Sequence, residues 1–128
     1  MGHTLRELKA WLLRREVRRC ERGPTAECSI IHDAPKEHEY WIPAETFTEA
    51  DGVGFLCPVC FEENGGPVGT HAVICWRPHV PSHVDPKPGR WEFAGTTLDD
   101  LTLVAGSSSV LLRGGCGAHF FVRSGRIA

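Results

Sequence analysis

Residues 52–60 read GVGFLCPVC, and this stretch decides the fold that we expect. Its first half, 53–56, is an apolar run with the length and composition of a short β-strand. Its second half is a Cys-x-x-Cys pair, Cys57 and Cys60. Two thiolates at this spacing can bind one metal ion, because the tight turn between them brings both sulfurs to the same side. The stretch therefore predicts a strand that leads directly into half of a metal site.

A second pair with the same two-residue gap lies near the end of the chain. Cys116 and His119 stand in a glycine-rich turn, 55 residues (61–115) after Cys60, and precede residues typical of a hairpin. A sheet that brings both turns together would make a tetrahedral site of three thiolates and one imidazole. Such ligands suit zinc better than calcium or magnesium. The sequence thus predicts one Zn²⁺ bound by Cys57, Cys60, Cys116 and His119.

Other interpretations of the cysteines stand beside this prediction. A redox Cys-x-x-Cys normally opens a helix in a βαβ unit, and the residues after Cys60 do not continue as an amphipathic helix. Cys75 lies in an apolar segment typical of a strand, where a free cysteine is usually a small core residue. It is the replacement ligand if His119 points elsewhere. A second metal site is an alternative, because four further potential ligands are present: Cys20, Cys28, His32 and His38. Their spacings match no strong metal-binding pattern.

The N-terminal segment, residues 4–22, has the pattern of an amphipathic helix. Thr4 and Glu7 have the spacing of a capping box, and Gly23-Pro24 would end the helix. Apolar residues recur at helical period, at Leu5, Leu8, Trp11, Leu12 and Val17, and arginines cover the other side. We expect the apolar stripe to dock on the domain and the arginines to face solvent. The alternative is that the arginines contact nucleic acid or an acidic partner.

The rest of the chain predicts a β-rich domain. Glycine (14) and proline (9) are abundant, which favours turns and short strands. Strands are expected at 40–42, 53–56, 71–76, 90–94, 101–104 and 109–112, with a hairpin over 120–127. Four prolines in 77–89 predict a long loop. We expect one domain, residues 1–128, of the mainly-β α+β class: a small antiparallel zinc-ribbon-like core over 53–128 and a helix at 4–22.

Composition and charge narrow the classes of function. The chain has 128 residues, of which 41% are hydrophobic and 23% charged, as in ordinary globular proteins. Its net charge of −2 provides no overall basic field for nucleic acid or an acidic membrane. No apolar run approaches the roughly 20 residues that span a bilayer, and no signal-peptide pattern is present. We therefore expect a cytoplasmic protein without a membrane partner, whose cysteines are metal ligands and buried thiols rather than disulfides.

Three motifs in the C-terminal half carry a resemblance to a known family. They are FLCPxC (55–60), GRWxFxG (89–95) and CxxHxFVRxGRI (116–127). Over residues 53–128 the chain resembles an uncharacterised domain family that is common in tailed-phage and prophage genomes and is often mislabelled as ammonia monooxygenase. The resemblance implies a small zinc-ribbon-like β module of phage or prophage origin, acting in the host cytoplasm. It implies no activity. The chain departs from the family at LTLVAGSSS (101–109), where members often carry Pro-x-Leu/Phe-Ser-Pro-Ser.

Four matched ligands favour a structural zinc, because a catalytic zinc keeps one position open for water. A zinc-dependent hydrolase is the alternative if one of the four is not a ligand. Its acid–base candidates would be His71, Glu92, Asp99 and Asp100. The chain carries no catalytic-triad, phosphate-loop or His-Glu-x-x-His signature.

The sequence therefore favours a binding or accessory module over an enzyme. We expect an unidentified protein partner or self-association, with the loop that holds Trp76, Arg77, His79 and His83 as one candidate surface. Nucleic-acid binding through the arginine-rich segment is the less favoured alternative. The net charge is slightly negative, and we expect no strand on which aromatic and basic residues interleave.

Overall fold

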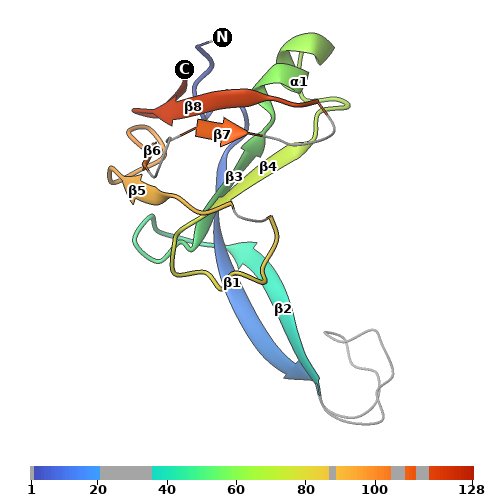
Figure 1. The fold of residues 1–128 in the computed structure, drawn as a ribbon, viewed down its shortest axis with the longest axis vertical. Coiled ribbons are helices and arrows are strands. Elements are labelled where there is room, and N and C mark those ends of the chain that lie inside the picture. The colour runs from blue at the N-terminus through green and yellow to red at the C-terminus, as the bar shows by residue number, and fades with distance from the viewer. Residues whose placement is uncertain (1, 21–35, 87–88, 105–108, 112–115) are drawn as a thin grey trace.

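The structure is a computed structural model that describes residues 2–20, 36–86, 89–104, 109–111 and 116–128. Over these residues the architecture consists of small antiparallel β-sheets and one short helix (Figure 1). In chain order the elements are β1 (Trp11–Cys20), β2 (Lys36–Pro43), β3 (Gly52–Leu56), α1 (Pro58–Asn64), β4 (Ala72–Trp76), β5 (Glu92–Ala94), β6 (Thr102–Val104), β7 (Ser109–Leu111), β8 (His119–Arg123) and β9 (Arg126–Ile127). The prediction of a mainly-β fold is confirmed.

The strands pair in three sheets, and each of these pairs is antiparallel. The largest sheet has the order β2-β1-β3-β4, the second pairs β5 with β6, and the third has the order β7-β8-β9. β1 pairs with β3 only over its first three residues and with β2 from Leu13 onward. Figure 1 shows the consequence: β1 and β2 leave the body as a two-stranded ribbon.

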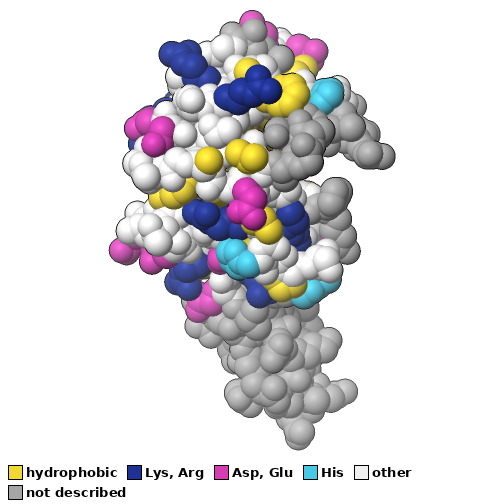
Figure 2. Space-filling model, turned by 60° about the vertical axis from the view of Figure 1, so that its left-hand side comes forward, with side chains coloured by type: hydrophobic (Ala, Val, Ile, Leu, Met, Phe, Trp, Pro, Cys, Tyr) yellow, Lys and Arg dark blue, Asp and Glu magenta, His cyan; other side chains and the backbone are white. Residues whose placement is uncertain are grey.

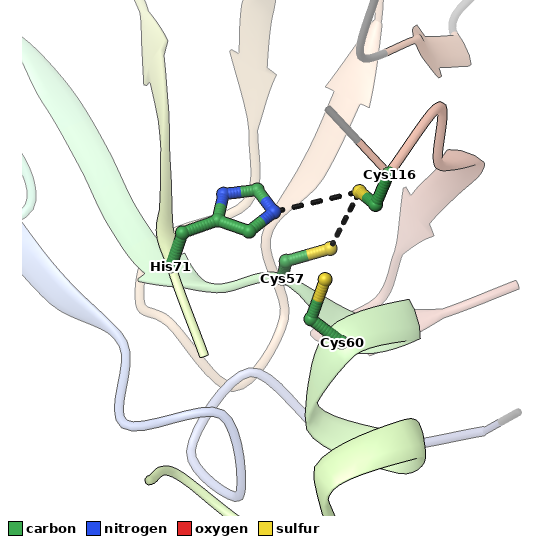
Figure 3. A group of neighbouring side chains, drawn as sticks. All are labelled: Cys57, Cys60, His71 and Cys116. Atoms are coloured by element: carbon green, nitrogen blue, oxygen red, sulfur yellow. Dashed lines mark hydrogen bonds between the residues drawn. The ribbon is translucent and has the colours of Figure 1, made fainter. Parts of the chain in front are cut away.

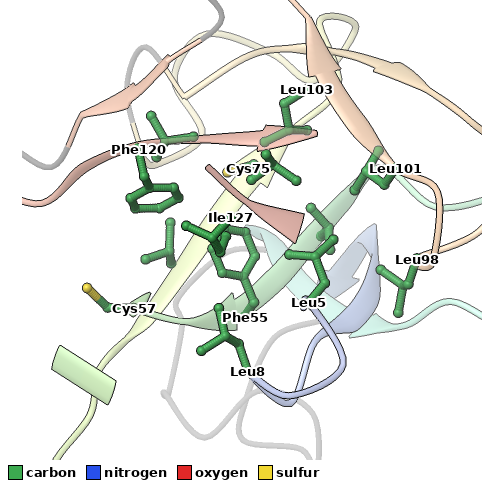
Figure 4. Packing of buried hydrophobic residues seen from close by; sticks show 14 of the residues in the cluster. Leu5, Leu8, Phe55, Cys57, Cys75, Leu98, Leu101, Leu103, Phe120 and Ile127 are labelled. Carbon is green, nitrogen blue, oxygen red and sulfur yellow. The ribbon is translucent and has the colours of Figure 1, made fainter. Parts of the chain in front are cut away.

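The main hydrophobic core lies between β3–β4 and β8–β9 (Figure 4). Phe55 of β3 and Phe120 of β8 are both buried, and their rings meet edge to face with centroids 6.0 Å apart. Along β8 the buried residues Phe120 and Val122 alternate with more exposed ones, as the period of two in a strand requires. The opposite face of β8 is therefore left at the surface.

The N-terminal segment forms one turn and then a strand, so the helix expected over 4–22 is a wrong prediction. The capping-box contacts are present: Glu7 N–H donates to Thr4 Oγ1 (3.1 Å), and Thr4 N–H donates to Glu7 Oε1 (3.4 Å). The turn ends at Lys9, whose φ of +57° is left-handed. Helices commonly end at a residue in this conformation.

Packing explains why the chain leaves the helical path. Leu5 and Leu8 are fully buried in the main core from within the turn. Residues 11–13 then pair with β3, and this non-local pairing overrides a local helical preference. In a strand neighbouring residues point to opposite faces, so Arg14 and Arg15 do not share the arginine face that a helix would provide.

The remaining strand predictions agree with the structure. Segments expected at 40–42, 53–56, 71–76, 90–94, 101–104, 109–112 and 120–127 correspond to β2 through β9. The alternative second metal site includes Cys28 and His32, which lie outside the described residues. In the described part of the chain, no helix has the length and apolar character needed to cross a membrane.

Candidate metal centre

Four potential ligands come together from three separate segments (Figure 3). Cys57 directly follows β3, and Cys60 lies in the first turn of α1. His71 immediately precedes β4, and Cys116 lies three residues before β8. Backbone pairing places His71 beside the first cysteine, because Cys57 N–H donates to the His71 carbonyl oxygen at 2.8 Å.

The spacing of the ligand atoms matches a tetrahedral zinc site. The three sulfurs and one imidazole nitrogen all lie within 4.8 Å of one another. Cys57 Sγ and Cys116 Sγ are 3.6 Å apart, and His71 Nε2 is 3.4 Å from Cys116 Sγ. With Zn–S near 2.3 Å and Zn–N near 2.0–2.1 Å, tetrahedral geometry separates two sulfurs by about 3.8 Å and sulfur from nitrogen by about 3.6 Å. A zinc ion therefore fits the group with small adjustments of the side chains.

The local backbone presents Cys57 and Cys60 on the same side. Pro58 occupies the first helical position, where its missing N–H costs nothing and its fixed φ suits a helix start. Phe61 N–H donates to the Cys57 carbonyl at 2.9 Å, which closes the first turn of α1. The two cysteines thus flank one helical turn, and their sulfurs converge.

The imidazole of His71 is oriented for ligation through Nε2. Its Nδ1 lies 3.3 Å from the Ala72 carbonyl oxygen. A carbonyl oxygen can only accept, so Nδ1 carries the proton in this contact and Nε2 keeps its lone pair toward Cys116. Metal-binding histidines are commonly held in this way, by a backbone carbonyl on the other ring nitrogen.

The thiols differ in how readily they lose their protons. The hydrogen bond between His71 and Cys116 lowers the pKa of Cys116 to about 7, and the Ala118 backbone N–H acts in the same direction. Burial raises the pKa of Cys57, and the backbone N–H groups of Cys60 and Val59 oppose that rise. Burial, followed by the neighbouring Cys116 and Cys57, raises the pKa of Cys60 to about 12. A divalent cation would reverse this balance by stabilising all three thiolates.

Three of the four ligands predicted from sequence belong to this group, and the fourth member is His71. His119 is not among the members. It is the first residue of β8, exposed, with its ring centroid 6.2 Å from that of Phe121. Because Phe120 and Val122 face the core, His119 faces the opposite way. Cys75 is fully buried in the core and is likewise outside the group.

The one sequence signal for His71 is its position as a polar residue at the start of an otherwise apolar segment. No second ligand lies at a characteristic spacing from it. Its role depends on the pairing of β3 with β4, which joins Leu56 to Ala72 and so sets His71 opposite Cys57. A pattern search along the chain cannot supply that register.

The acid–base candidates of a hydrolase have other contacts. Asp99 forms an ion pair with Arg6. Asp100 accepts backbone hydrogen bonds from Thr96 and Thr97, each at 2.8 Å, as expected of a turn. Glu92 is exposed on β5. Of the four candidates, His71 alone is a member of the ligand group.

Comparisons of the chain with protein-family models, curated proteins and solved structures give no match. The metal centre is therefore interpreted from its own geometry and chemistry.

Proposed function

We propose that this chain is a zinc-binding β domain in which Cys57, Cys60, His71 and Cys116 hold one structural Zn²⁺. The observation that carries the proposal is the convergence of three sulfurs and one imidazole nitrogen within 4.8 Å. Three thiolates and an imidazole are a ligand set that zinc prefers over hard cations. The phage or prophage relationship stays a prediction from the sequence.

The number of protein ligands supports a structural role for the metal. Four ligands complete a tetrahedron, so no position is left for the water that a catalytic zinc activates. The metal would connect the end of β3 and the start of α1 to the start of β4 and to the segment before β8. These segments are far apart in the chain, from residue 57 to residue 116. Metal binding therefore contributes directly to folding.

The exposure of the proposed ligands indicates that the metal takes the place of apolar packing at this site. Cys57 is buried, whereas His71 and Cys116 are exposed. Little apolar surface is therefore available to hold the segment before β8 against α1. A small domain with a modest core gains from such a metal link. We infer an accessory module that acts through contacts with a macromolecule, on surfaces that the zinc holds in place.

Metal analysis of paired variants tests the ligand set. We expect one zinc per wild-type chain, purified without chelator, and loss of that zinc in His71→Ala. His119→Ala is the matched control, because it removes an imidazole near Cys116 and should retain the metal. In the same way Cys116→Ala should lose zinc and Cys75→Ala should keep it. Cobalt substitution adds a spectroscopic measurement, since the charge-transfer bands report thiolate ligation.

Two outcomes would refute the proposal. Wild-type protein that binds no zinc when reconstituted under reducing conditions would show that the convergence is not a metal site. Retention of zinc by His71→Ala together with its loss from His119→Ala would show that the ligand set predicted from sequence is the correct one.

A further inference from the structure

The outward face of β8 carries three flat side chains in a row. His119, Phe121 and Arg123 alternate with the buried Phe120 and Val122, so all three point away from the core. The Arg123 guanidinium carbon lies 4.4 Å from the centroid of the Phe121 ring. The His119 ring is tilted by 36° to the same ring, with centroids 6.2 Å apart. An imidazole, a phenyl ring and a guanidinium thus form one continuous surface.

A fourth residue extends this row onto the neighbouring strand. Arg126 of β9 pairs directly with Arg123, so the two exposed side chains share a face of the hairpin. The turn between them, Ser124 and Gly125, has positive φ at both positions (49° and 74°), which is the tight turn that a two-residue hairpin needs. The hairpin therefore places two arginine residues directly opposite each other.

Like charges directly opposite each other in an antiparallel pair are destabilising. Among the described residues no carboxylate forms an ion pair with Arg123 or Arg126. Arg126 donates to the Gly2 carbonyl oxygen (3.1 Å), a contact that leaves its charge uncompensated. An anionic partner would relieve this repulsion. In the upper part of Figure 2, dark-blue Lys or Arg side chains lie on exposed yellow hydrophobic ones, with a cyan His beside them.

We propose that this face, formed by His119, Phe121, Arg123 and Arg126, binds single-stranded nucleic acid. Bases stack on aromatic and guanidinium planes, and arginine matches the geometry of phosphate oxygens. A duplex hides its base faces, so the stacking row favours a single strand. The expectation from sequence that no strand interleaves aromatic and basic residues does not hold for β8. The inference rests on the proposed function, because the zinc ligand Cys116 fixes the segment that leads into β8.

The test uses the zinc-loaded full chain and fluorescence anisotropy of labelled oligothymidylate and oligouridylate of about 12 nucleotides, a length within the usual site size. A duplex of the same length is the competitor. We expect saturable binding to the single strands, weaker binding to the duplex, and an affinity that falls as salt rises from about 50 to 200 mM.

Variants separate stacking from charge. Phe121→Leu keeps an apolar side chain and removes the aromatic plane, and should weaken binding about 5- to 150-fold, the equivalent of one lost base stack. Arg123→Gln and Arg126→Gln should each reduce the slope of log affinity against log salt by roughly 0.7. Arg14→Gln is the matched control: it removes one exposed arginine from β1 and should change neither quantity.

Zinc content measured on the same samples keeps the two proposals apart. His119→Ala should retain zinc and lose part of the affinity for oligonucleotides. This result would show that His119 belongs to the nucleic-acid surface and is not a zinc ligand. The inference is wrong if zinc-loaded wild type binds neither single strand, if it prefers the duplex, or if Arg14→Gln weakens binding as much as Arg123→Gln. If wild type binds neither single strand, an acidic protein surface is the next partner to test. That outcome would not change the assignment of the zinc ligands.

Discussion

The two ends of β4 lie in regions that hold their loops by different means. His71, just before β4, belongs to the group of potential metal ligands, and we call this region the metal end. Trp76, the last residue of β4, belongs to a region that is held by arginine side chains, which we call the arginine end. One strand of five residues thus connects the proposed metal site with a region that is held by the positive charges of its own arginine side chains.

At the arginine end, Arg90 organises the proline-rich loop. Its guanidinium donates to the carbonyl oxygens of Val80, Pro81, Val84 and Pro86. The Trp76 ring N–H also donates to this loop, to the Asp85 carbonyl oxygen at 2.8 Å. Prolines cannot donate through their backbone, so the loop has many acceptors and few donors, and one guanidinium supplies several.

A second arginine joins this region to the rest of the body. The Arg77 guanidinium lies over the rings of Phe47 and Phe93, at 5.0 and 4.5 Å from their centroids. It also donates to the carbonyl oxygens of Phe47 (2.8 Å) and Ala50 (2.7 Å). Burial lowers the pKa of Arg77, although the group stays charged at any pH the protein would meet.

A small β domain can therefore order loops rich in carbonyl oxygens with arginine side chains, and loops rich in metal ligands could be ordered in the same way by a bound cation. A guanidinium has a fixed set of donors, so the arginine end is complete as soon as the chain folds. On the proposed function, the metal end would need a separate ion and deprotonated thiols. We therefore expect the metal end to be the region whose order varies with conditions.

Removal of zinc should have the largest effect, and an unequal one. At zinc concentrations about 1,000 times Kd, binding stabilises the fold by about 4 kcal/mol, so chelation should lower Tm by roughly 10–20 °C for a chain of this size. Amide hydrogen exchange should show that α1 and the start of β8 lose protection first, while the N–H groups of Trp76 and Arg77 keep theirs. Equal loss of protection at both ends would contradict the contrast between them.

Arg90→Lys should have an intermediate effect that is confined to the arginine end. Lysine keeps the charge but cannot reach several carbonyl oxygens with one planar fork. Carbonyls left without a donor should cost about 2–3 kcal/mol of unfolding free energy, measured by urea denaturation. Arg14→Lys is the control, since the Arg14–Glu16 pair is only half-buried and 3.9 Å apart. Zinc stoichiometry should stay at the wild-type value, and its loss would show that the two ends are coupled.

Sequence reasoning predicted the parts of this comparison that depend on local spacing. The Cys-x-x-Cys pair is recognisable because two ligands in one turn have a characteristic gap. Cys116 was selected through the same gap to His119, which is not a member of the group. The capping-box contacts of Thr4 and Glu7 are local in the same sense and are confirmed. The short strands between glycine and proline turns were predictable for the same reason.

Pairing between distant segments decided the parts that sequence reasoning missed. In place of the helix expected at 4–22, residues 11–20 form β1, because residues 11–13 pair with β3 and the strand continues beside β2. The ligand group contains His71 in place of His119 because the β3–β4 register sets it beside Cys57. The alternation of Phe120 and Val122 was visible in the sequence, however, and already indicated that His119 points outward.

The smallest predicted effect concerns how the N-terminus is held at the metal end, and it depends on pH. His3 Nε2 lies 2.6 Å from Glu62 of α1, and its Nδ1 lies 3.2 Å from Glu7. These hydrogen bonds, with Glu62 the stronger contributor, raise the pKa of His3 above its ordinary 6.5. The His3 ring also meets Phe61 edge to face, with centroids 5.4 Å apart.

A raised histidine pKa in the folded state stabilises the fold fully below the unfolded pKa, and the stabilisation is lost as pH rises through the folded value. The Tm difference between wild type and His3→Gln should therefore be largest near pH 6 and shrink toward pH 8–9, by a few degrees at most because Glu62 is exposed. Both proteins are compared at each pH, so the pH dependence of zinc binding cancels. In a Glu62→Gln background the same comparison should vary less with pH, because only the contact with Glu7 then remains. A Tm difference that grows with pH would show that neutral His3 makes the contact. The positive charge of His3 would then not stabilise the metal end.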